Sequence, residues 1–151
     1  MAREFEPVYF TDENTLGLGK LLHRSGRDDV LYPGHEYLPE IPRETPDLEW
    51  MPVVARRGLV VVSRDRRIRS RPAELKAYLE LGIRSVWIGG KRDLGPQDQL
   101  EVFLAHEVRL RREIIKRGPG PWALALSPTG LRPLRLREHP ERLAFDAPFR
   151  M

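Results

Sequence analysis

The sequence predicts an α/β fold in three layers, a mainly parallel β-sheet with helices on both faces. Two observations support this class. Strand-like and helix-like segments alternate along most of the chain, which is typical of a parallel sheet covered on both sides. Residues 59–62, Leu-Val-Val-Val, are apolar without alternation, as in a strand that is buried on both faces. The 151 residues are enough for a domain with a substantial core.

The N-terminal part of the chain predicts a strand, a helix and a second short strand. The first strand is the apolar run at 8–11, which ends in acidic residues. Thr15 is a suitable N-cap for a helix over 16–23, whose leucines share one side. A brief strand at 29–32 follows.

A proline-rich segment separates these elements from the strand at 59–62. Residues 33–46 contain four prolines and one glycine, so we expect an irregular loop beside the strand ends. Thr45 as N-cap and a proline at the first helical position predict a helix over 46–57. Pro52 inside it should bend the helix or make its first turn a separate piece.

The C-terminal half continues the alternation and ends in a predicted β-hairpin. We expect one domain over 1–151, with a core at about 7–118 and a hairpin and tail over 119–151. The predicted elements are a helix at 72–81, a strand at 83–88, a helix at 96–116, and hairpin strands at 122–127 and 131–137.

The composition excludes several classes of site and favours a polyanionic partner. The absence of cysteine excludes disulfides, thiolate metal sites and a cysteine nucleophile. No apolar run approaches the roughly 20 residues of a membrane span, so we expect a cytoplasmic protein. The net charge of +4 and pI near 9.8 suit contact with nucleic acid.

Acidic residues follow the predicted strands at the point where each strand ends. Asp12 follows the first strand, Asp65 the strand at 59–62, and Asp93 the next strand along the chain. The carboxyl ends of parallel strands meet at one edge of the sheet, where ligands of open α/β sheets bind. The helix that carries Asp47 near its N-terminus should point this residue at the same edge.

Carboxylates gathered in this way suit Mg²⁺ or Mn²⁺, which prefer oxygen ligands and can assist attack of water on a phosphodiester. Glu13 or Glu49 could replace one of the aspartates as a ligand. A simpler explanation is also open: Asp47 is then only a helix N-terminal acid, and Asp12 and Asp65 are turn residues.

Three segments combine the acids with their neighbouring residues: 10–14 (Phe-Thr-Asp-Glu-Asn), 45–50 (Thr-Pro-Asp-Leu-Glu-Trp) and 60–65, the last of which ends in Ser-Arg-Asp. Together they resemble the PIN-like nucleases, especially the VapC-type toxins of bacterial toxin–antitoxin pairs. In that family the corresponding acids bind divalent metal and the protein cleaves RNA. The resemblance implies that the metal ligands here are Asp12, Asp47 and Asp65, with Asp93 in a looser match to a fourth position.

The resemblance covers residues 7 to 95 and implies a metal-dependent endoribonuclease, with Mg²⁺ or Mn²⁺ as cofactor. The partners to be expected are an RNA substrate, a cognate antitoxin that covers the acidic cleft, and a second copy of the chain. The sequence departs from the standard toxins in two places. The loop at 33–46 replaces helices that are common there, and the long helix at 96–116 with its hairpin lies outside the motifs.

Basic and aromatic residues near the predicted site are candidates for RNA contact. Arg64 and Arg66 flank Asp65, and Arg67 follows, so that their guanidinium groups could bind phosphates. The side chains that could stack on bases are Trp50, Trp87 and Trp122, although the last two lie within predicted strands and are better explained as core.

Two other functions compete with the nuclease. Asp65 with Lys91 would suit a signalling domain resembling response-regulator receivers, which also pair acids with Mg²⁺ on a parallel sheet. An intervening strand with the expected Ser or Thr is not visible, however. The third hypothesis is a catalytically inactive module that binds RNA or a protein partner.

Overall fold

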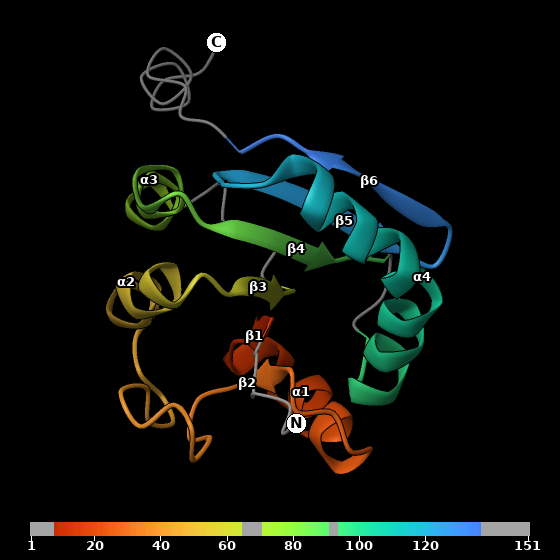
Figure 1. Cartoon of the computed structure of the whole chain (residues 1–151), viewed down its shortest axis with the longest axis horizontal. Helices are drawn as coiled ribbons and strands as arrows, with labels where there is room; N and C mark the ends of the chain where they lie inside the picture. Colours follow the sequence, from red (N-terminus) through yellow and green to blue (C-terminus); the bar gives the residue numbers. More distant parts are fainter. Residues whose placement is uncertain (1–7, 65–70, 91–93, 137–151) are drawn as a thin grey trace, which may run out of the picture.

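The structure, a computed structural model, describes residues 8–64, 71–90 and 94–136 (Figure 1). Within these residues a six-stranded sheet has the order β2-β1-β3-β4-β5-β6. Neighbouring strands are parallel except β5 and β6, which form an antiparallel hairpin. The predicted parallel sheet with a C-terminal hairpin is therefore confirmed.

The elements follow the predicted order, with boundaries shifted by a few residues at most. The strands are β1 (Tyr9–Thr11), β2 (Val30–Leu31), β3 (Val60–Ser63), β4 (Arg84–Ile88), β5 (Trp122–Ser127) and β6 (Gly130–Leu134). The helices are α1 (Leu16–Arg24), α2 (Asp47–Arg57), α3 (Pro72–Leu81) and α4 (Pro96–Arg117), and a short 3₁₀ turn, η1 (Glu13–Thr15), precedes α1. None of the described helices has the length and apolar character of a bilayer span.

The helices form two layers, as the alternation predicts. Figure 1 shows α2 and α3 on one side of the sheet and α1 and α4 on the other. Leu18 of α1 and Phe103 of α4 belong to one buried cluster, and Trp50 of α2 and Tyr78 of α3 belong to the second. Each face of the sheet thus has its own apolar core.

The close approach of α1 to β1 depends on a glycine. A Cβ atom at Gly19 would lie 2.2 Å from Oγ1 of Thr11 and 3.2 Å from the ring of Tyr32. No side chain fits there without a shift of the helix, since real Cβ atoms do not come within 3 Å of their neighbours. Gly19 therefore serves the packing of α1.

The start of α2 differs from the prediction in two respects. Pro46, not Thr45, is the N-cap residue, because the Thr45 hydroxyl donates to the carbonyl of Pro42 instead of to the helix. The helix also continues through Pro52. Of the two effects predicted for this proline, a separate first turn is therefore wrong.

The proline-rich segment between β2 and α2 has no helix or strand, as predicted, but it is part of the core. Leu38 and Ile41 are fully buried and pack in the cluster that contains Trp50. The backbone N–H of Gly34 donates to the carbonyl of Ile41 at 2.8 Å and closes the segment on itself. The segment is therefore a compact loop that covers the α2 side of the sheet.

The two edge strands offer little backbone for further pairing. β2 has two residues, Val30 and Leu31, and pairs with β1. β6 contains Pro133, which is paired in register with Leu124 of β5. Proline lacks an N–H group, so it is tolerated in an edge strand and cannot donate to another strand.

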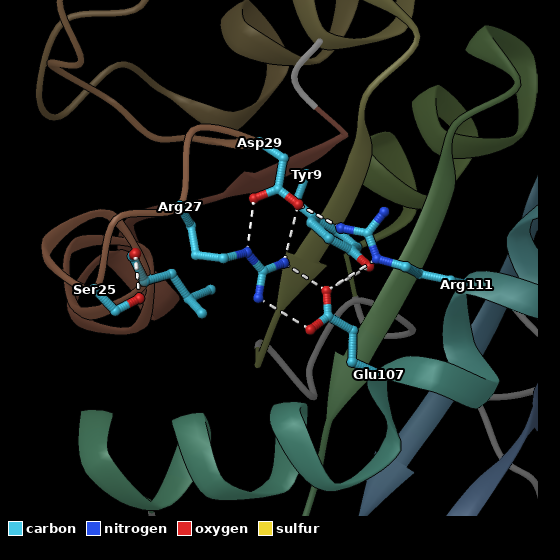
Figure 2. A network of polar contacts seen from close by, with 7 residues as sticks. Tyr9, Ser25, Arg27, Asp29, Glu107 and Arg111 are labelled. Atoms are coloured by element: carbon cyan, nitrogen blue, oxygen red, sulfur yellow. Dashed lines mark hydrogen bonds and ion pairs between the residues drawn. The ribbon is translucent and has the colours of Figure 1, made fainter. Parts of the chain in front are cut away.

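A charged network joins α4 to the segment between α1 and β2 (Figure 2). Arg27 is bidentate to Asp29, at 2.9 and 3.0 Å, and bidentate to Glu107 of α4, at 2.5 and 3.0 Å. Arg111, one turn further along α4, donates to both acids. The two positive and two negative charges balance. The bonds from Arg27 and Asp29 to α4 join residues about eighty positions apart in the chain.

The buried ring of Tyr9 connects this network to the sheet. Its hydroxyl donates to Glu107 at 3.3 Å, and the guanidinium carbon of Arg111 lies 5.3 Å from the ring centroid. Since Tyr9 begins β1, the network holds α4 against the amino end of the strand whose other end carries Asp12.

We expect Glu107→Ala to lower the free energy of unfolding by about 2 kcal/mol, because it leaves two partly buried guanidinium groups without one of their acids. Glu113→Ala is the matched control on α4, since Glu113 pairs only locally with Arg117. It should cost about 0.5 kcal/mol or less. Urea unfolding measures both free energies of unfolding. Equal decreases for the two variants would show that the network stabilises the fold no more than the local Glu113–Arg117 pair does.

Candidate functional site

Asp12 lies at the carboxyl end of β1, beside the end of β3. The two strands are parallel neighbours with Thr11 opposite Val62, so that the next residues, Asp12 and Ser63, meet at the same edge. The Ser63 hydroxyl donates to Oδ2 of Asp12 at 2.6 Å, and both residues are buried. Only 4 % of Asp12 is exposed, so this carboxyl group has little contact with water.

Thr15 connects the same carboxyl group to the backbone of β3. Its hydroxyl lies 3.0 Å from Oδ1 of Asp12 and 2.6 Å from the carbonyl of Val62. The N–H of Asn14 also donates to Oδ1, at 3.1 Å. Because one hydroxyl has one proton for two acceptors, Thr15 shares its proton between Asp12 and the Val62 carbonyl in a three-centre hydrogen bond.

The environment of Asp12 favours its neutral form. Burial raises the pKa of Asp12 from an ordinary value of 3.8 to about 6, against the opposing hydrogen bonds from Ser63 and Thr15. The negative charge of Asp47 raises this pKa further, so the two carboxylates are near enough to repel each other. An ionised Asp12 is therefore a group that a cation would stabilise.

Asp47 is the first residue of α2, and two neighbours orient its carboxylate. The indole Nε1 of Trp50 donates to Oδ1 at 3.0 Å, and a guanidinium nitrogen of Arg71 lies 3.9 Å from Oδ2. Trp50 itself is 1 % exposed. The prediction that Trp50 stacks on bases is thus wrong, since its ring is in the core and its polar end positions Asp47.

Trp87 and Trp122 lie in strands, as their sequence context indicates. Trp87 is buried, and its Nε1 donates to the hydroxyl of Ser85 at 2.8 Å. Trp122 is partly exposed and donates to the carbonyl of Gly118. Both are structural residues of the second half of the sheet.

Glu13 does not join the aspartates, although the sequence allowed it as a substitute ligand. Its carboxylate accepts the N–H of Glu44 at 2.6 Å and contacts the guanidinium of Arg43. Burial acts to raise the pKa of Glu13, but these donors outweigh it and hold the pKa below its ordinary value. The other substitute, Glu49, is exposed on α2.

Part of the predicted site lies outside the described residues, namely Asp65, Asp93, Lys91, Arg66 and Arg67. Arg64 is described and follows β3 directly, where it is partly buried. In the ranges that the structure describes, no three His, Asp or Glu side chains form a group that could hold a metal ion. Of the predicted acids, the structure describes Asp12 and Asp47, whose negative charges are near enough to interact.

Ser63 and Thr15 are site residues that the sequence did not indicate. Ser63 was part of the Ser-Arg-Asp motif, and Thr15 was predicted to cap α1. Thr15 does occupy the N-cap position, but its hydroxyl makes no capping bond and points to Asp12 instead. A hydroxyl residue at the end of one strand, Ser63, opposite an acid that follows the neighbouring strand is the signal that could have found part of this arrangement.

The donor set fits a hard divalent cation. Asp12 and Asp47 offer carboxylate oxygens from two separate segments, and each oxygen of Asp12 accepts protein hydrogen bonds that fix its direction. Oxygen ligands with hydrogen-bonded supports are what Mg²⁺ and Mn²⁺ sites use. Asp12 and Asp47 could therefore contribute ligands to such an ion.

Comparison with known protein families identifies a domain in the N-terminal part of the chain. The sequence model of a family described as a PIN like domain matches residues 7–90, which is more than half of the chain. The matched segment includes β1 to β4 and the candidate acids Asp12, Asp47 and Asp65, and it ends before α4. No curated protein and no solved structure matches the chain significantly.

We expect Asp12→Asn to stabilise the metal-free protein at neutral pH. With the pKa of Asp12 raised to about 6, the folded state binds a proton more tightly than the unfolded state does. Stability therefore falls as the pH rises from about 4 to about 6, and the cost of the ionised carboxylate is complete above that range. Removing the charge should then restore up to about 3 kcal/mol.

Urea unfolding in a chelator at pH 4 and pH 8 measures this effect. The difference between variant and wild type should be near zero at pH 4 and largest at pH 8. Asp98→Asn, which changes an exposed acid on α4, is the control. A stabilisation that does not depend on pH, or a loss of stability at pH 8, would show that Asp12 is not a buried, strained carboxylate.

Proposed function

The chain belongs to the PIN-like domain family, and from this membership we propose that it is a metal-dependent endoribonuclease. The observation that carries the proposal is the buried carboxyl group of Asp12, which two hydroxyl groups hold at the carboxyl edge of the sheet near Asp47. A carboxyl group with no role beyond structure would not need to be buried beside another acid.

The proposed ligands are Asp12, Asp47 and Asp65, with Asp93 as a fourth acid. A bound Mg²⁺ or Mn²⁺ ion would supply Lewis acidity at the scissile phosphate and increase the acidity of water there. Ser63 and Thr15 hold the Asp12 carboxyl group in place, and Trp50 does the same for Asp47. Such fixed carboxylates keep the reacting groups aligned without forming a covalent intermediate.

RNA binding is proposed to depend on basic groups beside these acids. Arg64 follows Ser63 directly, so its backbone lies at the end of β3, on the edge of the sheet that carries Asp12. Arg66 and Arg67 would extend this basic segment. Guanidinium groups bind phosphates with two hydrogen bonds, and such binding weakens as the salt concentration rises.

The physiological role that we propose is that of a bacterial toxin. An antitoxin would then inhibit the enzyme by covering the acidic cleft, and a basic side chain inserted among the carboxylates would suit its charge. The protein would act on cytoplasmic RNA. The test is whether a small DNA-binding protein encoded next to this gene forms a complex with the chain and blocks cleavage.

We expect the wild-type protein to cleave single-stranded RNA with Mn²⁺ and to be inactive in excess EDTA. Asp12→Asn and Asp65→Asn should each lower the cleavage rate by about 100-fold or more. Each change removes the negative charge of a proposed metal ligand and keeps the shape of the side chain. Cleavage of labelled RNA on gels measures the rate, and circular dichroism confirms that the variants fold.

Glu80→Gln is the control, because Glu80 is exposed in the last turn of α3, at the opposite edge of the sheet from the helix starts. It should retain the wild-type rate. Cleavage that persists in EDTA, or variants of Asp12 and Asp65 that remain fully active, would contradict the proposed mechanism. Transfer of phosphate from a small donor to Asp65 would support the receiver-like alternative instead.

We expect Arg64→Ala to weaken RNA binding at every salt concentration and to reduce the slope of log affinity against log salt by about 1, as the loss of one phosphate contact predicts. Fluorescence anisotropy of a labelled oligonucleotide in EDTA measures binding without cleavage. Arg109→Ala, on the exposed side of α4, is the control. An unchanged slope would show that Arg64 does not contact phosphate.

A further inference from the structure

We infer that Glu13 is a positioning residue that sets the separation between Asp12 and Asp47. This inference depends on the proposed metal-dependent function, in which both aspartates bind one ion. Glu13 follows Asp12 directly, and its side chain is bonded to the segment that leads into Asp47. It thus connects the two acid-bearing segments without being a ligand itself.

The contact of Glu13 with this segment has two parts. Its Oε2 accepts the backbone N–H of Glu44 at 2.6 Å, and the Arg43 guanidinium donates to the carboxylate at 3.2 to 3.3 Å. The ion pair is largely solvated, since the side chains of Arg43 and Glu13 are 50 % and 32 % exposed. The bond from the backbone is therefore the stronger constraint.

The backbone around Glu44 indicates that this position is held by its surroundings. Glu44 has φ of 67°, the left-handed region that residues other than glycine rarely adopt. The next residue, Thr45, donates from its hydroxyl to the carbonyl of Pro42 at 2.7 Å. Together these features form a tight turn that ends at Pro46, so Asp47 begins α2 at a defined place relative to Glu13.

The hydrogen bond between Glu13 and Glu44 joins two segments that are far apart in the sequence. Glu13 and Glu44 are 31 positions apart, and the loop between β2 and α2 lies in that interval. The middle of the loop is anchored by buried Leu38 and Ile41, whereas its end is anchored through Glu13. Without this bond, the like charges of Asp12 and Asp47 would be free to move their segments apart.

A purely electrostatic effect of Glu13 makes a different prediction for Arg43. If Glu13 acted only through its negative charge near the ion, removal of the positive charge in Arg43→Ala would strengthen Mn²⁺ binding. If Glu13 acts by holding the turn, the same change removes part of the link and weakens binding. The two explanations thus differ in the sign of one measured effect.

The experiment measures Mn²⁺ affinity of the full chain by the electron paramagnetic resonance signal of free Mn²⁺. Glu13→Ala should weaken binding by about 10-fold, the scale of lost outer-shell support. Glu13→Gln keeps an acceptor for the Glu44 N–H and should lose less. Arg43→Ala should also weaken binding, by less than Glu13→Ala does. Thermal unfolding shows whether each variant is folded. If Glu13→Ala does not fold, the Mn²⁺ affinities of Glu13→Gln and Arg43→Ala test the positioning role of Glu13.

A matched control lies at the other end of α2. Glu40, in the same loop, pairs with Arg57 at 2.9 Å and resembles the Glu13–Arg43 pair in charge and exposure. Glu40→Ala should leave Mn²⁺ affinity within about twofold of wild type, since it is not linked to Asp47. Equal losses for Glu40→Ala and Glu13→Ala would show that only general loop stability matters, and would overturn the inference.

Two further outcomes separate the inference from the proposed function. If the wild type binds Mn²⁺ and Asp12→Asn abolishes binding, but Glu13→Ala has no effect or Arg43→Ala strengthens binding, the positioning role is wrong and the metal site stands. If the wild type does not bind Mn²⁺, or Asp12→Asn binds it equally well, the proposed metal site is wrong and the inference fails with it.

Discussion

The parallel pairing of β1 with β3 is the constraint on which the candidate site depends. It places Asp12 beside Ser63 and brings the hydroxyl of Thr15 within reach of both Asp12 and the β3 backbone. These contacts keep a carboxyl group in a place where water is scarce. Because the strands are short and buried, a shift of one residue in their register would turn each apolar side chain to the opposite face. The register of the core thus also defines the site.

The remaining parts of the fold support this pair of strands from both ends. At the amino end, the network of Arg27, Asp29, Glu107 and Arg111 joins α4 to β1 through Tyr9. At the carboxyl end, Glu13 joins the residues after β1 to the turn that precedes α2. Trp50 orients the carboxylate of Asp47 at the start of α2. The site is therefore held by long-range polar contacts on a rigid apolar sheet, which is the usual way in which proteins fix charged groups.

The fold could be predicted from the sequence largely because its patterns are local. Helix α3 begins at Pro72 and ends before Gly82, and these two residues are strong start and stop signals. The alternation of strands and helices likewise predicted the order and the layers. The start of α2 was less predictable, since Thr45 can donate either to the helix or to Pro42 and only the folded turn decides between them.

The candidate site was only partly predictable, because its geometry depends on residues far apart in the chain. The positions of Asp12 and Asp47 follow from the rule that strand ends and helix starts share one edge of a parallel sheet. Thr15 and Trp50 each lie three positions from the acid that they contact, but this spacing alone does not distinguish a polar support from a simpler role. Each residue also fits such a role, Thr15 as a cap and Trp50 as a core aromatic.

The two ends of the sheet have a consequence for assembly. A strand that is only two residues long and a strand interrupted by Pro133 give a neighbouring molecule almost no backbone to which it could add. Within the described residues, pairing of a further strand at either edge is therefore disfavoured. The same holds for the ordered stacking of strands that is seen in fibrils.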